Sequence, residues 1–142
     1  MDKKDLLKQL IVAERENPTK LIRHPDDVVP MLMKYAKKKE ENFYVVLLSG
    51  QREVICISHV SKGLANRTLV HSREVFREAI KKGACSVIVA HNHPSGNSQC
   101  SGEDEEVTKR LKSAGEIVGI PVIDHIIVSK GGYYSFLEGG KM

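Results

Sequence analysis

The sequence lacks the features of a secreted or membrane-spanning protein. Cysteine is scarce, because Cys56, Cys85 and Cys100 are the only three, and they form no Cys-x-x-Cys pair that would indicate a disulfide framework. Its apolar runs have the length of a strand, far below the roughly 20 residues that span a bilayer. The charged start, Met1–Asp5, contains no apolar stretch of the kind found in a signal peptide. We therefore expect a cytoplasmic protein without a membrane segment.

Low-complexity sequence is also absent. The 142 residues are 41% hydrophobic and 28% charged, which predicts a globular chain of single-domain size. The net charge is +4, and its densest basic spots are Lys37–Lys39 and Lys81–Lys82. Both end helical patterns, where cations complement the helix dipole on a solvated face, and no aromatic residues interleave with them. DNA is thus a partner that these residues do not support.

The apolar periodicity predicts alternating helices and strands. Helices are expected from Asp2 to about Glu16, from about Asp26 with Pro30 in its first turn, over Arg73–Lys82 with Ser72 as N-cap, and from a Ser101 N-cap to about Val118. Strands are expected at Phe43–Leu48, Glu53–His59, Thr68–Val70, Cys85–Ala90, Pro121–Val128 and Tyr133–Phe136. Residues predicted to face the core of the helices are Met31, Leu32, Tyr35, Ala36, Val107, Leu111 and Ala114. This order predicts an α/β fold with a mixed sheet flanked by helices.

A metal site is indicated by residues 91–104, which read HNHPSGNSQCSGED. His91 and His93 are two apart at the end of a predicted strand, so both rings project to one side while Asn92 points away. Two imidazoles and one carboxylate with an open fourth position form a catalytic zinc shell. Asp104 falls in the first turn of the helix capped by Ser101, where the helix dipole favours a carboxylate. We predict that His91, His93 and Asp104 bind Zn²⁺.

The same segment is similar to the JAMM (MPN-type) metalloprotease signature, His-x-His, seven residues, Ser, two residues, Asp. The variant His-Asn-His-Pro-Ser-Gly, with residues 70–74 upstream and 123–125 downstream, resembles the RadC branch of that family from about Glu41 onwards. This resemblance implies a cytidine-deaminase-like α/β architecture. It also implies that residues 1–22 form an N-terminal helical extension and residues 23–142 the metal-binding domain.

The resemblance further implies a catalytic base and an oxyanion donor. Water bound to zinc still needs a base, and the family glutamate lies upstream of the histidines, at a position that Glu41 matches two residues before Phe43. Glu40 is the alternative if the strand starts one residue off. The family serine corresponds to Ser101, whose hydroxyl would serve both as N-cap and as donor to the oxyanion of a tetrahedral intermediate.

Neighbouring cysteine and histidine residues leave alternatives open. Cys100, directly before Ser101, is either an ordinary loop cysteine, which we favour, or an inhibitory thiolate at the fourth coordination site. His71 and His125 match family positions, but His125 lies in an apolar strand and is interpreted as a hydrogen-bonded core histidine beside the site. His24 and His59 are interpreted as structural or exposed.

Three functions are compatible with these residues. The resemblance favours a zinc-dependent hydrolase that acts on a peptide or isopeptide bond of an unknown protein or peptide substrate. RadC proteins are often associated with DNA repair, but no residue here performs a step on DNA. The second function is a non-catalytic MPN-type binding module, and the third is a metal-dependent nuclease, suggested by the letters HNH. An exposed edge strand would favour a homodimer or capture of an extended peptide.

Overall fold

The computed structural model describes residues 2–5, 20–62 and 70–142, and within them a single five-stranded sheet. Its spatial order is β2-β1-β3-β4-β5, in which β3 and β4 are parallel and every other neighbouring pair is antiparallel. The strands are β1 (Asn42–Leu48), β2 (Val54–Lys62), β3 (Ser86–Asn92), β4 (Val122–Ser129) and β5 (Gly132–Ser135). The predicted mixed α/β sheet is therefore confirmed.

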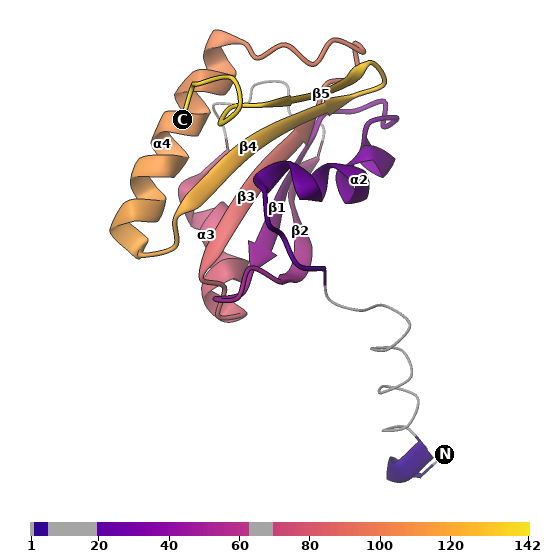
Figure 1. Cartoon of the computed structure of the whole chain (residues 1–142), viewed down its shortest axis with the longest axis vertical. Helices are drawn as coiled ribbons and strands as arrows, with labels where there is room; N and C mark the ends of the chain where they lie inside the picture. The colour runs from indigo at the N-terminus through magenta and orange to yellow at the C-terminus, as the bar shows by residue number, and fades with distance from the viewer. Residues whose placement is uncertain (1, 6–19, 63–69) are drawn as a thin grey trace.

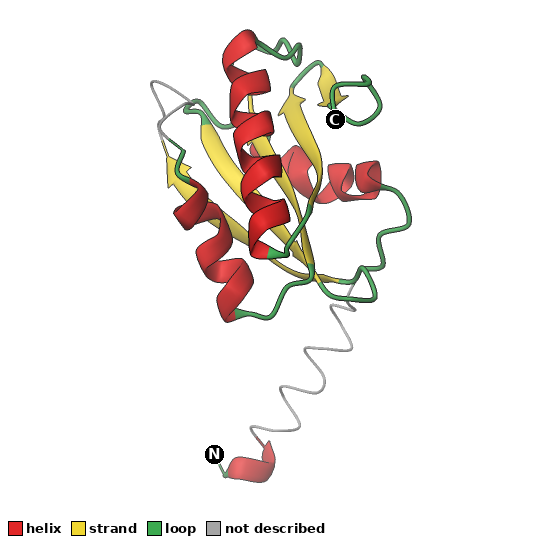
Figure 2. Cartoon of the chain, turned by 90° about the vertical axis from the view of Figure 1, so that its left-hand side faces the viewer, coloured by secondary structure: helices red, strands yellow, loops and turns green. Residues whose placement is uncertain are grey.

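Helices cover both faces of this sheet. The long helices α3 (Ser72–Lys81) and α4 (Gly102–Val118) lie on one face, and the short segments around α2 (Val29–Leu32) lie on the other (Figures 1 and 2). Alternate residues of β1 enter two separate cores: Phe43 packs with the residues under α3 and α4, and Tyr44 packs with those under α2. All seven residues of β1 are buried because neither face of the strand is exposed to water.

The helix predicted from Asp26 is in fact three short pieces. A 3₁₀ turn at Pro25–Val28 precedes α2, and a second 3₁₀ turn follows at Met33–Tyr35. Pro30 has no backbone N–H to donate to the carbonyl of Asp26, so a continuous α-helical ladder cannot form across it. Leu32 and Ala36 are buried as predicted, while Met31 and Tyr35 are half-buried against the same core.

Other predicted boundaries shift by small amounts. Ser72 is the first residue of α3, and the N-cap is His71, whose side chain makes no capping hydrogen bond. The predicted strand 53–59 continues to Lys62, which pairs with Asn42 of β1, and the predicted strand 85–90 continues to Asn92, which pairs with Val128 of β4. Most of the helix predicted over 2–16 and of the strand predicted over 68–70 lies outside the described residues. None of the described helices has the length and apolar character needed to cross a membrane.

Helix α4 packs closely on β4 at Gly115. A Cβ at this position would lie 2.6 Å from the carbonyl oxygen of Ile120 and 3.3 Å from side-chain atoms of Phe76 and Val122. The backbone oxygen cannot move away cheaply, because Gly115 also accepts the N–H groups of Gly119 and Ile120 that end the helix. The close approach of α4 to the sheet therefore depends on the missing side chain.

We expect Gly115→Ala to lower the free energy of unfolding by about 1–3 kcal/mol, the range for overpacking, although alanine is the better helix former. Denaturant unfolding followed by circular dichroism measures the change. Gly102→Ala is the matched control, since a Cβ there has open space around it and lies in the same helix. An unchanged or higher stability of Gly115→Ala would contradict the close packing.

Candidate metal centre

The end of β3 brings the two histidines of the motif together. His91 lies within the strand and pairs with Phe43 of β1, and His93 follows directly after the strand. Their Nε2 atoms are 2.9 Å apart, and both residues are buried, with exposed fractions of 0% and 6%. As the alternation of a strand predicts, Asn92 lies on the opposite face. The side chains predicted to share a metal ion therefore meet.

Asp104 reaches the same pair from the first turn of α4. Its Oδ1 lies 3.2 Å from Nε2 of His91, and its Oδ2 lies 3.4 Å from Nε2 of His93. Ser101 is the N-cap, and the two residues form a reciprocal capping box: Ser101 N donates to Oδ2 of Asp104, and Asp104 N donates to Oγ of Ser101. The hydrogen bonds that start the helix thus also orient the carboxylate toward the histidines.

Glu41 supplies a second carboxylate from the residue just before β1. Its Oε1 is 3.7 Å from Nε2 of His91, and Glu41, His91 and His93 offer ligand atoms that all lie within 4.8 Å of one another. Glu41 and Asp104 are thus competing candidates for the third ligand. Asp104 is closer to both rings and fully buried, whereas the side chain of Glu41 is 12% exposed and farther away. This geometry favours Asp104 as ligand and leaves Glu41 at the distance of a group that contacts bound water.

Hydrogen bonds on the far side of the His91 ring fix its tautomer. The Thr108 hydroxyl donates its one proton to the carbonyl of Asp104 at 2.7 Å, so at 2.5 Å it accepts from Nδ1 of His125. Nε2 of His125 is then an acceptor, and Nδ1 of His91 donates to it at 2.8 Å. The consequence is that Nε2 of His91 presents a lone pair to the site.

His93 is fixed in the same sense by a backbone carbonyl. Its Nδ1 donates to the carbonyl oxygen of Asn97 at 2.8 Å, because a carbonyl can only accept. Its Nε2 therefore also carries a lone pair, which faces that of His91 beside the Asp104 carboxylate. Against the opposing effect of burial, the Ser101 N–H donates to Oδ2 of Asp104 and lowers the pKa of that carboxyl.

This donor set fits a cation. Burial lowers the pKa of His91 despite the nearby carboxylates, so the ring is neutral at neutral pH and no proton lies between the two Nε2 atoms. Ligand atoms bound tetrahedrally to zinc at about 2.0–2.1 Å lie about 3.3 Å from one another. The 2.9 Å between the two ring nitrogens and the 3.2 Å from Nε2 of His91 to Oδ1 of Asp104 are close to that spacing, while the other oxygen of Asp104 lies 3.4 Å from Nε2 of His93.

Asn92 anchors the segment that carries Glu41, a role that the sequence did not predict. Its buried amide accepts from the backbone N–H of Asn42 at 2.7 Å and donates to the carbonyl oxygens of Glu40 at 2.9 Å and Lys38 at 3.3 Å. Glu40 itself is exposed, so the structure places Glu41, and not the alternative Glu40, against His91. No local pattern indicates these bonds, since their partners are 50–54 residues apart.

The remaining candidates contact groups other than the predicted ligand atoms. The thiol of Cys100 lies 4.0 Å from Oε1 of Glu105 in α4, and both interpretations of this cysteine stay predictions. His125 is buried and hydrogen-bonded beside the site, as interpreted from the sequence. His71, His24 and His59 are exposed. The assignment of His91, His93 and Asp104 to metal, and of Glu41 and Ser101 to catalysis, stays a prediction that this geometry supports.

Comparison with known proteins identifies the family. The family model described as RadC-like JAB domain matches residues 22–141. The chain belongs to the RadC-like JAB domain family. Its five-stranded sheet with helices on both faces is the α/β architecture expected for a JAB (MPN-type) domain.

Similar curated proteins carry the name UPF0758 protein. That of Alkaliphilus metalliredigens is 44% identical over 139 residues, 97% of this chain and 60% of the relative, and that of Rubrobacter xylanophilus is 46% identical over 140 residues, with the same coverage. The UPF0758 protein STH371 of Symbiobacterium thermophilum is 51% identical over 102 residues, 72% of this chain and 44% of the relative. The chain thus spans 60% or less of the length of these relatives.

We expect Asn92→Ala to lower the free energy of unfolding by about 1–3 kcal/mol, because the buried N–H of Asn42 loses its acceptor. Bound zinc should stay at the wild-type level, since the amide lies on the face opposite the ligands. Denaturant unfolding and metal analysis by mass spectrometry test both parts. Gln51→Ala, which removes an exposed amide side chain between β1 and β2, is the control and should leave both unchanged. Loss of zinc from Asn92→Ala would contradict this division between the two faces.

Ser101→Ala removes the capping hydroxyl and should lower the free energy of unfolding by roughly 1 kcal/mol, with zinc retained. Any hydrolase rate should also fall, since the hydroxyl proton is the group expected to contact an oxyanion. Ser113→Ala, at an exposed position of the same helix, serves as control for both measurements. Zinc loss from Ser101→Ala would instead show that the serine acts mainly by orienting Asp104.

Proposed function

We propose that this chain is a zinc-dependent hydrolase that cleaves a peptide or isopeptide bond. The observation that carries the proposal is the meeting of two buried imidazole lone pairs with one carboxylate, together with a second carboxylate 3.7 Å away. Structural zinc sites are usually closed by four protein ligands, whereas three protein ligands and an open position for water are typical of catalytic sites. Membership of the RadC-like JAB domain family supports the same chemistry.

Each residue has a defined task in this proposal. His91, His93 and Asp104 would hold zinc, which when bound supplies a Lewis acid that lowers the pKa of water toward neutrality. Glu41 accepts the proton of the attacking water and delivers it to the leaving amine. The Ser101 hydroxyl accepts from Asp104 N, and its own proton is directed to the oxyanion.

The hydrogen-bonded partners of the ligands support catalysis as well as binding. Thr108 and His125 hold the His91 ring, and the Asn97 carbonyl holds the His93 ring, so neither imidazole has to reorient when the ion binds. Asn92 holds the backbone on both sides of Glu41, which keeps the base at a constant distance from the ligands. A binding module would have no need for a base held in this way.

The His-Asn-His motif is arranged differently from that of the nucleases suggested by these letters. Those enzymes distribute the three residues along a ββα-metal hairpin, whereas His91 here belongs to a strand whose β4 neighbour is parallel, and the next helix begins at Gly102. The adjacent carboxylates and the RadC-like JAB family then favour peptide-bond hydrolysis over phosphodiester cleavage.

Metal analysis of purified protein should find about one zinc per chain in the wild type and in Glu41→Gln, and little in His93→Ala or Asp104→Asn. The comparison separates the two carboxylates, because Glu41→Gln would lose zinc if Glu41 were the third ligand. Glu40→Gln is the matched control on the neighbouring residue. A wild-type protein that binds no zinc even after reconstitution would overturn the proposal in favour of the binding module.

Activity against a library of peptide and isopeptide-linked fluorescent substrates tests the reaction itself. A substrate that wild type cleaves should be cleaved about 10²–10⁴-fold more slowly by Glu41→Gln at equal zinc content, the range for loss of a general base. Glu40→Gln should retain the rate. Equal rates of Glu41→Gln and wild type would remove Glu41 from the mechanism.

A further inference from the structure

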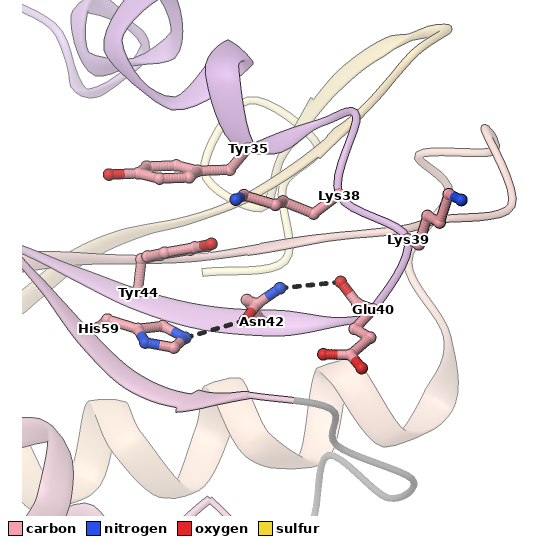
Figure 3. Close-up of a pocket in the computed structure, with 7 residues that line it drawn as sticks. All are labelled: Tyr35, Lys38, Lys39, Glu40, Asn42, Tyr44 and His59. Atoms are coloured by element: carbon pink, nitrogen blue, oxygen red, sulfur yellow. Dashed lines mark hydrogen bonds between the residues drawn. The ribbon is translucent and has the colours of Figure 1, made fainter.

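A cavity of about 610 Å³ opens on the face of the sheet opposite the metal centre, between the 3₁₀ turn Met33–Tyr35 and the strands β1 and β2 (Figure 3). One wall is a column of three rings. Tyr35 and Tyr44 stack with centroids 3.9 Å apart and an angle of 18°, and His59 follows 5.2 Å from Tyr44. The His59 ring is tilted by 33° to that of Tyr44 and is exposed, so a further ring can pack against its open side.

The rim of this cavity is positively charged. Lys38 and Lys39 both line it, both are exposed, and no residue in the described ranges forms an ion pair with either ammonium group. The ammonium of Lys38 lies beneath Tyr35 on the cavity side, whereas the carboxylate of Glu40 points away from it (Figure 3). The local charge therefore attracts an anion.

Asn42 and Tyr44 form the floor of the cavity, where the Tyr44 hydroxyl is an uncharged hydrogen-bond donor. Asn42 donates to the Glu40 carbonyl at 2.9 Å and contacts Nε2 of His59 at 2.9 Å, which sets the His59 ring in place. Burial and the neighbouring Tyr35 raise the pKa of Tyr44 to about 12, so its hydroxyl keeps its proton. That hydroxyl is on the side of the ring toward Lys38 and Asn42 (Figure 3).

We propose that this cavity is a second binding site, independent of the metal centre, for a small molecule in which a planar ring carries a phosphate or carboxylate group. The ring packs against the exposed side of His59, and the anionic group lies toward the Tyr44 hydroxyl, on the side of the rings where Lys38 lies (Figure 3). Neither the lysines nor the rings alone would give specific binding. The exposed lysines bind bare anions weakly because salt screens their charge, and the rings alone do not distinguish a charged aromatic ligand from a neutral one.

Titration of the full-length protein, followed by NMR of the histidine and tyrosine rings, tests this site with phenyl phosphate, benzoate, inorganic phosphate and phenol as probes. Phenyl phosphate or benzoate should shift His59 and Tyr44 and bind about tenfold more tightly than inorganic phosphate or phenol. Whichever of phenyl phosphate and benzoate binds more tightly identifies the anionic group that the site prefers. Binding at the metal centre instead would shift His91 and His93, and it would overturn the assignment if His59 and Tyr44 stayed unchanged.

Two lysine variants locate the charge. Lys38→Met should weaken the phenyl phosphate or benzoate complex by about five- to tenfold. Lys82→Met, which removes one equally exposed positive charge at the end of α3, should bind as the wild type does. Equal weakening by both variants, unchanged binding by Lys38→Met, or equal affinity for inorganic phosphate would each overturn the proposal.

Discussion

The protons of His91 and His93 constrain this structure more than any other feature. Each ring directs its N–H outward, to His125 in one case and to the Asn97 carbonyl in the other, and both lone pairs face the buried space beside Asp104. Two lone pairs 2.9 Å apart next to a charged carboxylate repel one another unless a cation lies between them. The surrounding hydrogen bonds hold the rings in this arrangement, which is favourable only when the site is filled.

The parallel pair in the middle of the sheet brings these groups together. A strand, a crossover helix and a parallel strand place the start of α4 above the carboxyl end of β3, where ligands collect in open α/β sheets. Asp104 therefore reaches His91 from a different element without a long loop. The antiparallel neighbour β1 contributes Glu41 at the same end because its direction is reversed.

The sequence was sufficient to predict the parts of the site that lie close together in the chain. His91, His93, Ser101 and Asp104 fall within fourteen residues: strand alternation places the two histidines on one side, helix capping places Asp104 in the first turn, and the resemblance to the JAMM signature implies that they meet. The anchoring of Glu41 by Asn92 and the tautomer set by Thr108 and His125 could not be predicted in this way, because they depend on the register between distant elements. Thr108 left a weak signal, since it lies one helical turn after Asp104.

Because side chains alternate along β3, the three successive residues 91–93 act on opposite faces of the sheet. His91 and His93 serve the helix-covered face, and Asn92 between them serves the other face, where it ties down the backbone beside Glu41. Inserting or deleting one residue in this strand would exchange the faces and place an amide beside Asp104 and an imidazole among the backbone carbonyls. A change in the length of the loop 94–100 leaves these faces as they are, provided that a backbone carbonyl still meets Nδ1 of His93. The approach to the site can therefore vary more than the spacing within the strand, where only insertions of two residues keep each side chain on its own face.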